Sequence, residues 1–263
     1  MEKLSFPKMR STGLTYSDLL QARADAYNAL KGTLTGYHCD KCNDKGNIAY
    51  VEEEQEIMRY CSCMKTRDTL RRIRESGLED LLRIYTFSNF EAVTSFQKHM
   101  KQSAADFLQQ RHKWFFIGGQ TGCGKTHICT AMVGGFIKQG LSVRYLVWQE
   151  DANRLKFALT DGSYCKQIAQ YKEADVLYID DLFKVKDNCM KEITNADVKI
   201  AFELLDYRGR NQMTTILSTE WTTPQLMEID EAITGRIIKM AQEYSIDVKK
   251  DRAKNYRLKG VRS

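Results

Sequence analysis

The sequence has few prolines, no long hydrophobic run and no recognisable leader. Its only prolines are Pro7 and Pro224, which argues against a long proline-rich linker. No apolar run approaches the roughly 20 residues of a membrane helix, and no basic-then-apolar segment opens the chain. We therefore expect a cytoplasmic protein with no membrane partner. A chain of 263 residues suffices for one large domain plus a small module.

A glycine-rich segment between residues 119 and 126, GQTGCGKT, fits the phosphate-loop pattern G-x-x-x-x-G-K-[ST]. The apolar run at 114–117 predicts a strand before it, and residues 128–138 predict a helix after it. Glycines allow backbone N–H groups to surround phosphates, and the helix N-terminus favours negative charge. We expect Lys125 to reach the β/γ-phosphates and the Thr126 hydroxyl to bind Mg²⁺. The candidate nucleotide-binding residues are Gly119, Gln120, Thr121, Gly122, Cys123, Gly124, Lys125, Thr126 and His127.

Two adjacent acids follow a second apolar run. Residues 176–179 predict a buried strand that ends in Asp180 and Asp181, 55 positions after Lys125. We expect this strand to lie next to the phosphate-loop strand, with Asp180 holding the water shell of Mg²⁺. Asp181 stands where many ATPases carry a glutamate that polarises the attacking water. Since aspartate is one methylene shorter, slow hydrolysis is expected.

Four of the eight cysteines lie within 25 positions. Cys39 and Cys42 form a C-x₂-C pair, eighteen residues intervene, and Cys61 and Cys63 form a C-x-C pair. Short predicted strands at 48–50 and 57–60 would bring the second pair back to the first, which indicates a closed structural Zn²⁺ site. Because a nucleotide motif belongs inside the cell, we interpret the cysteines as thiols or metal ligands. Either His38 replaces one cysteine, or all four cysteines bind the metal.

The two ends of the chain suggest contacts with other molecules. Residues 17–31 predict a helix, capped by Ser17 or Asp18, whose apolar stripe would pack on this chain or on another protein; the stripe contains Leu19, Leu20, Ala26, Tyr27 and Leu30. The last fifteen residues hold seven basic residues and one acid, and so account for the entire net charge of +6. This tail either follows a nucleic-acid backbone or is a solvated terminus.

The order of predicted elements indicates a parallel, doubly wound α/β sheet of the P-loop NTPase type. Strands are expected at 142–148, 214–219 and 244–248, and helices at 94–110, 196–207 (capped by Asn195) and 231–242. Residues 149–171 should be mostly helical with a break at 161–162. We expect three segments: a helical and zinc-binding partner module (1–75), a linker (76–92) and an AAA+ ATPase domain with a basic tail (93–263).

Several segments resemble the AAA+ helicase loaders of the DnaC/DnaI type and the related IstB-like ATPases. The similar segments are HCDKC with CSC, TFSNF, GGQTGCGKTH, ADVLYIDDLF, STEWTTPQLMEIDEAITGRIIKM and KNYRL. The resemblance implies an ATPase whose Walker B acids are Asp180 and Asp181. It places Thr219 or Ser218 in the sensor-1 region, and Arg236 at the arginine finger that completes a neighbouring subunit's site. Only 27 residues follow Arg236, so we expect no full helical lid.

The resemblance also implies partners and cofactors. A loader would use ATP/ADP, Mg²⁺ and Zn²⁺, self-associate through its ATPase domain, and bind a replicative hexameric helicase and single-stranded DNA. Its hydrolysis is expected to be slow and stimulated by DNA or the partner. The alternatives are an IstB-like transposition helper, a P-loop kinase and an adaptor that binds ATP without turnover.

Overall fold

The computed structural model describes residues 15–75, 78–186, 189–251 and 254–256, and these form two compact units. The first unit ends at Arg67 and the second begins at Asp68, earlier than the boundary expected after residue 75. Helix α2 (Cys63–Glu75) contains this division. Of the basic tail, only Lys249–Asp251 and Lys254–Tyr256 fall within the described residues. Among the described residues, no helix combines the length and apolar character that a membrane crossing requires.

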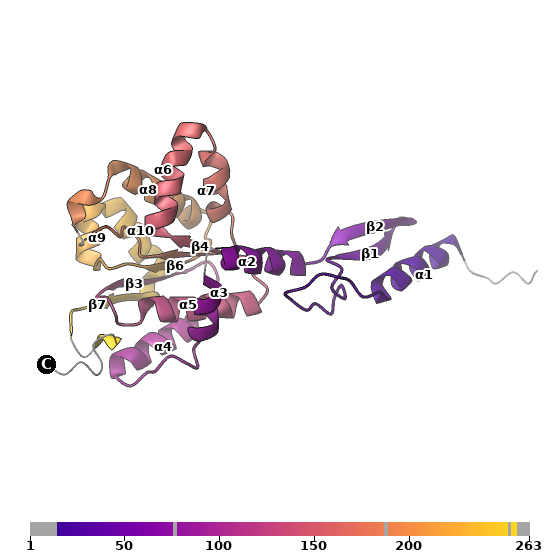
Figure 1. Ribbon diagram of the computed structural model, residues 1–263, viewed down its shortest axis with the longest axis horizontal. Coiled ribbons are helices and arrows are strands. Elements are labelled where there is room, and N and C mark those ends of the chain that lie inside the picture. The colour runs from indigo at the N-terminus through magenta and orange to yellow at the C-terminus, as the bar shows by residue number, and fades with distance from the viewer. Residues whose placement is uncertain (1–14, 76–77, 187–188, 252–253, 257–263) are drawn as a thin grey trace, which may run out of the picture. The chain divides into compact units, whose positions relative to one another are not determined.

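In the first unit, helix α1 (Tyr16–Ala29) packs on an antiparallel hairpin of β1 (Asn47–Glu52) and β2 (Gln55–Tyr60) (Figure 1). The Asn28 side chain holds the two together, because it donates to Ala49 O at 2.8 Å and accepts from Ala49 N at 3.0 Å. The stripe expected on α1 was wrong in part. Leu20 and Ala24 are its buried residues, whereas Leu19, Ala26 and Leu30 are exposed. Thr15, and not Ser17 or Asp18, caps the helix.

The second unit is built on a five-stranded parallel sheet in the order β4-β5-β6-β3-β7. The strands are β3 (Trp114–Gly119), β4 (Val143–Val147), β5 (Val176–Asp180), β6 (Thr214–Ser218) and β7 (Ser245–Val248). One expectation is therefore wrong: β6 lies between the phosphate-loop strand β3 and the acid-bearing strand β5. Strand neighbours depend on long-range pairing, which no local pattern in the sequence encodes.

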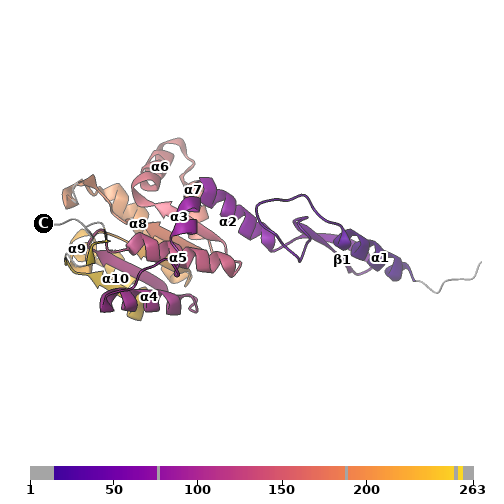
Figure 2. The ribbon, with the colours of Figure 1, turned by 60° about the horizontal axis from the view of Figure 1, so that its bottom comes forward.

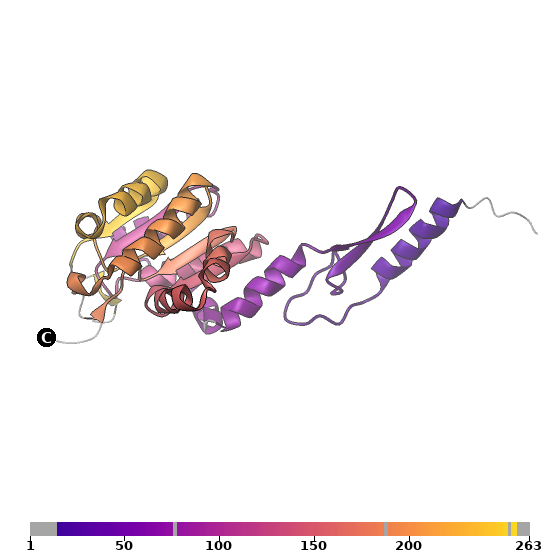
Figure 3. The same cartoon turned by 90° about the horizontal axis from the view of Figure 1, so that it is seen from above.

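Helices cover both faces of this sheet. Figures 1 and 2 show α3 (Leu78–Ile84), α4 (Ser95–Phe107) and α5 (Lys125–Lys138) on one face. In Figure 3 the orange and yellow helices of the other face lie over the strands. That face carries α6 (Trp148–Asp161), α7 (Tyr164–Lys172), α8 (Asn195–Arg210), α9 (Thr223–Ile229) and α10 (Glu231–Ala241). Short 3₁₀ turns lie at Met190–Glu192 and Gln242–Tyr244.

Each face has its own hydrophobic core because side chains alternate along the strands. On β3, Trp114 and Phe116 join the core under α8 and α10, whereas Phe115 and Ile117 join the core under α4 and α5. All six residues of β3 are buried. The strand that carries the phosphate loop is thus fixed on both sides.

A buried cation links α7, α8 and β6. Arg208 on α8 is fully buried, and burial lowers its pKa to about 9, so it stays charged at neutral pH. Its guanidinium donates to the carbonyls of Tyr171, Lys172 and Ala174 at 2.9, 3.0 and 2.9 Å. It also donates to Thr214 O at 2.5 Å and to Thr215 Oγ1 at 2.9 Å. These acceptors satisfy the buried charge, and losing it would leave several carbonyls unpaired.

Candidate nucleotide-binding site

The loop between β3 and α5 has the backbone that a phosphate site requires. Gly119, Gly122 and Gly124 have φ values of 101°, 74° and 95°, a region that side chains disfavour. A Cβ at Gly119 would also lie 2.3 Å from Val248 O on the neighbouring strand. Helix α5 begins at Lys125 with Gly124 as its N-cap, so no capping side chain competes for the first N–H groups.

Lys125 is positioned within this loop. It is buried, and its Nζ atom donates to Gly119 O at 2.8 Å and to Gln120 O at 2.9 Å. Two backbone carbonyls thus hold the ammonium group over the loop, and phosphate oxygens are acceptors of the same kind with more charge. Beside it, Cys123 is buried and its thiol donates to Gln120 O at 3.1 Å.

A cavity of about 510 Å³ opens at the loop. One side is polar and contains Thr121, Gly122, Gly124, Lys125, Thr126, Asp181 and Glu220, and the other contains Tyr85, Asn89, Phe90, Glu91, His127 and Tyr256. Gly119 and Gln120 line a neighbouring hollow instead. Of the nine predicted nucleotide-binding residues, six therefore line this cavity: Thr121, Gly122, Gly124, Lys125, Thr126 and His127.

His127 belongs to the aromatic side of the cavity. Its ring stacks on Tyr85 with centroids 4.6 Å apart and meets the edge of Phe90 at 5.1 Å. The Nε2 atom lies 3.0 Å from Thr86 O. Burial lowers the pKa of His127, which favours the neutral ring at physiological pH. This wall suits a flat, uncharged ring system better than a phosphate.

The two acids at the end of β5 differ in environment. Asp180 is buried, and its Oδ1 atom accepts from Ser218 Oγ at 2.5 Å and from Tyr178 OH at 2.7 Å. Its Oδ2 atom accepts from Tyr145 OH at 2.9 Å. Asp181 lines the cavity instead, with a φ of 54°. Burial, followed by the charge of Asp180, raises the pKa of Asp181.

The two candidates for the sensor-1 position at the end of β6, Thr219 and Ser218, make different contacts. Thr219 is buried, donates to Leu182 O at 2.7 Å and accepts from Trp221 N at 3.2 Å, so its hydroxyl serves the backbone. Glu220, the next residue, lines the cavity and forms an ion pair with Lys184. Ser218 is the β6 side chain that contacts an acid of the site.

Arg236 lies on α10 and is not among the residues that line the cavity beside Lys125. Its guanidinium pairs with Asp206 Oδ1 on α8 at 2.7 Å and lies 5.5 Å from the centre of the Phe202 ring. The structure therefore does not bring Arg236 into the site of its own chain.

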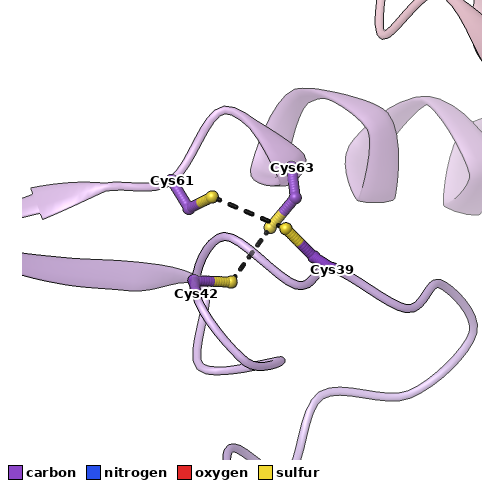
Figure 4. A group of neighbouring side chains, drawn as sticks. All are labelled: Cys39, Cys42, Cys61 and Cys63. Carbon is purple, nitrogen blue, oxygen red and sulfur yellow. Dashed lines mark hydrogen bonds between the residues drawn. The ribbon is translucent and has the colours of Figure 1, made fainter. Parts of the chain in front are cut away.

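The four predicted cysteines converge in the first unit (Figure 4). Their sulfur atoms all lie within 4.8 Å of one another and are buried. The Cys39–Cys61 and Cys42–Cys63 sulfur pairs are 3.8 and 3.5 Å apart. Four thiolates at about 2.3 Å from one Zn²⁺ lie about 3.8 Å from each other in a tetrahedron, so the donor set fits this metal.

His38 lies outside the cysteine cluster. Its Nδ1 atom is 2.8 Å from Asp44 Oδ2, and its Nε2 atom is 2.8 Å from Asp40 Oδ1. The hydrogen bond with Asp44 is the main cause that raises the pKa of His38. Asp44 also accepts from Cys39 N at 2.9 Å and from Arg67 at 2.7 Å, so it supports the turn that carries the first cysteine pair.

Three tyrosines of the site, Tyr145, Tyr178 and Tyr256, were not predicted from the sequence. Tyr178 stands two positions before Asp180, so the period of a strand could have placed both on one face. Tyr145 is on a different strand, and only the pairing of β4 with β5 brings it to the acid. Tyr256 lines the cavity from the far end of the chain, and no local signal ties it to the loop.

Comparison with known proteins defines the family. Residues 50–259 match the family model described as IstB-like ATP binding protein. The phage-like element PBSX protein XkdC of Bacillus subtilis is 31% identical over 239 residues, which cover 86% of this chain and 88% of that protein.

Solved structures share the fold of the second unit. The DnaC helicase loader superimposes with a TM-score of 0.56 at 17% identity, over 65% of this chain and 99% of that chain. The replication initiator DnaA bound to AMPPCP and single-stranded DNA gives 0.54 at 20% identity over 66% of this chain. This chain spans 54% of that DnaA chain. With its phosphate loop, its acids and its matched family, the chain belongs to the IstB-like ATP-binding proteins and is an AAA+ P-loop ATPase.

Proposed function

We propose that the protein is an ATP-dependent loader that binds a replicative hexameric DNA helicase and single-stranded DNA, and places the helicase on DNA at an origin or fork. The observation that carries this proposal is the joining of an ATPase unit to a separate cysteine-cluster unit. An ATPase alone needs no second unit, whereas a loader needs a module that holds its cargo. The fold shared with the DnaC helicase loader supports this reading.

The first unit has the surface expected of a partner module. Within its described residues, Tyr16, Leu19 and Leu30 on or beside α1 are 64%, 53% and 61% exposed. Tyr60 at the end of β2 is 88% exposed. Large apolar side chains gathered on one small unit are typical of a protein-binding surface. Zn²⁺ held by Cys39, Cys42, Cys61 and Cys63 would fix the fold of this unit.

In the ATPase unit, each candidate residue has a role that suits its position. The 119–126 loop holds the phosphates, with Lys125 on the β/γ-phosphates and Thr126 on Mg²⁺, and His127 lies on the base side of the site. Asp180 orients the water shell of Mg²⁺, and Asp181 orients the attacking water. Arg236 reaches the site of a neighbouring subunit, since it lies away from its own. The raised pKa and short side chain of Asp181 favour slow hydrolysis that DNA or the partner stimulates.

Two measurements test the loader. The protein should co-purify with the replicative helicase of its host, and its ATPase rate should rise with single-stranded DNA. Lys125→Ala, which removes the phosphate contact, is the control for a contaminating ATPase. Absence of DNA binding in every nucleotide state, together with failure to bind the helicase, would contradict the proposal.

An IstB-like transposition helper is the second candidate, because the matched family is described as IstB-like ATP binding protein. The insertion sequence IS1162 putative ATP-binding protein of Pseudomonas fluorescens is 29% identical over 118 residues, covering 44% of this chain. Such a helper would share the ATPase chemistry and bind a transposase. Parallel pull-downs with a helicase and a transposase, on the same preparation, separate the two functions.

A further inference from the structure

The chain returns to the phosphate loop after β7. Gln120 N donates to Val248 O at 3.1 Å, and the Gln120 side-chain amide donates to Asp251 O at 2.8 Å. Asp251 N in turn donates to Gln120 Oε1 at 2.5 Å. These reciprocal bonds lead the chain from the end of the sheet along the outside of the loop.

Tyr256 is then fixed at both ends. Its backbone N–H donates to Gly122 O at 2.8 Å, and its hydroxyl donates to Glu91 O. The ring therefore extends from the phosphate loop to the segment that precedes α4. Burial raises the pKa of Tyr256 to about 12, so the hydroxyl keeps the proton that it donates.

Two glycines of the phosphate loop leave the space that Asn255 and Tyr256 occupy. A Cβ at Gly122 would lie 2.2 Å from Asn255 Oδ1, and a Cβ at Gly124 would lie 3.3 Å from the Tyr256 ring. Glycine at these positions thus allows close contact with the segment 254–256, in addition to the positive φ values. The phosphate loop and the segment 254–256 therefore pack directly against each other.

The cavity separates a polar side from an aromatic side. Lys125, Thr126 and Asp181 suit phosphates and Mg²⁺, whereas Tyr85, Phe90 and Tyr256 suit a flat base. The ring of Tyr256 lies 6.1 Å from that of Phe90 at an angle of 65°. Because Lys125 and the N-terminus of α5 attract the phosphates, the aromatic residues, Tyr256 among them, are the part of the lining that suits the base.

We propose that Tyr256 is a nucleotide-binding residue whose ring forms the wall against the adenine base of ATP, held in place by Gly122 and Glu91. The proposal rests on ATP binding by the family and adds a base-contacting side chain from the C-terminal segment. Base recognition then depends on residues beyond the sheet, while phosphate recognition depends on the loop.

Affinity measurements with two ligands test this division. Tyr256→Ala keeps the backbone N–H bond to Gly122 and removes the ring. It should weaken binding of Mg·ATP about tenfold, the scale of one lost stacking contact. Binding of inorganic tripolyphosphate, which has no base, should stay within about twofold of the native value. Tyr256→Phe keeps the ring and should weaken ATP binding about threefold or less.

The matched control is Phe157→Ala, which removes an aromatic ring that is 75% exposed on α6, away from the cavity lining. It should leave both affinities unchanged. Unchanged ATP affinity in Tyr256→Ala would overturn the proposal. An equal loss for ATP and tripolyphosphate would also overturn it, because Tyr256 would then act through the loop and not on the base.

A second variant covers the case in which the alanine protein does not fold. Tyr256→Trp keeps a ring, and its fluorescence relative to the native protein should respond to ATP and not to tripolyphosphate. Equal responses, or none, would contradict the proposal. These experiments use the chain alone, so failure of both the DNA-binding and helicase-binding tests would contradict the loader proposal and leave the nucleotide-affinity results unaffected.

Discussion

The hydroxyl of Ser218 on β6 donates a hydrogen bond to Asp180 Oδ1 on β5 at 2.5 Å. The Ser218 hydroxyl oxygen in turn accepts a hydrogen bond from the Asp181 N–H at 3.1 Å. One side chain thus fixes the carboxylate of the first acid and the backbone of the second, whose φ of 54° is unusual for aspartate. Ser218, on the strand between the phosphate loop and the acids, orients both.

Substitution of Ser218 should therefore affect the chemical step. Ser218→Ala is expected to lower kcat about tenfold with little change in KM, because a hydrogen bond to a charged group is lost while the phosphate loop remains. Steady-state ATPase kinetics measure this. Thr219→Ala is the matched control: it should lower the free energy of unfolding by about 1 kcal/mol and preserve kcat. The reverse pattern would assign the role to Thr219.

The raised pKa of Asp181 predicts a pH dependence. Only the carboxylate form can orient the attacking water, so the ATPase rate should rise with pH through a pKa above the ordinary aspartate value of about 3.9. Asp181→Asn should lose most of the rate and this acidic limb, whereas Asp181→Glu should retain both. A rate profile in Asp181→Asn that still falls in acid would assign the limb to another group.

The raised pKa of Asp181 also affects the stability of the folded protein. A carboxyl group whose pKa is raised on folding binds its proton more tightly in the native state, so ionisation at neutral pH destabilises that state. Asp181→Asn, which cannot ionise, should raise Tm at pH 7 in the absence of nucleotide. The difference should shrink as the pH falls toward the ordinary aspartate pKa of about 3.9. Calorimetry at several pH values measures it.

Arg236 should act on a neighbouring subunit. Arg236→Ala is expected to reduce kcat roughly a thousandfold, as loss of an arginine finger does, and to leave ATP affinity nearly unchanged. Mixing it with Lys125→Ala should restore activity, because each variant supplies the part that the other lacks. Arg210→Ala is the control, since Arg210 also pairs with Asp206, at 2.6 Å. Failure of the mixture to recover would argue against action between subunits.

The cysteine cluster should hold one Zn²⁺ per chain. Cys63→Ser is expected to lose the metal, measured by elemental analysis, and to make the first unit sensitive to protease. ATP binding should persist, because the phosphate loop belongs to the second unit. Cys165→Ser is the control, since Cys165 is exposed and outside the cluster. A native protein without zinc, or a variant that keeps it, would contradict the assignment.

The elements of the ATPase unit could largely be predicted, because their signals are local. Strand runs such as 114–117 and 176–179 and the break at Gly162 all lie where the patterns indicate. The short helix α9 was not predicted. The cap of α8 was placed at Asn195, but Thr194 caps it, in a box with Asp197. The T-x-x-D spacing of Thr194 and Asp197 is the sequence signal of this capping box.

The site was less predictable, because its residues meet through long-range pairing. The phosphate loop is contiguous and carries its own pattern, whereas Asp180 takes its partners from β4 and β6. Cys123 lies within the loop, where burial raises the pKa of its thiol. Tyr256 joins the site because the chain returns to the phosphate loop after β7, and no local sequence pattern predicts that path.

Arg208 also limits how the second unit can deform. Its charge holds the end of α7 against the start of β6, so α7 cannot move away from the sheet without leaving a buried cation without its acceptors. Movement of this helix is therefore coupled to loss of hydrogen bonds at a buried charge, which makes the α7–β6 junction one of the stiffest parts of the described ATPase unit.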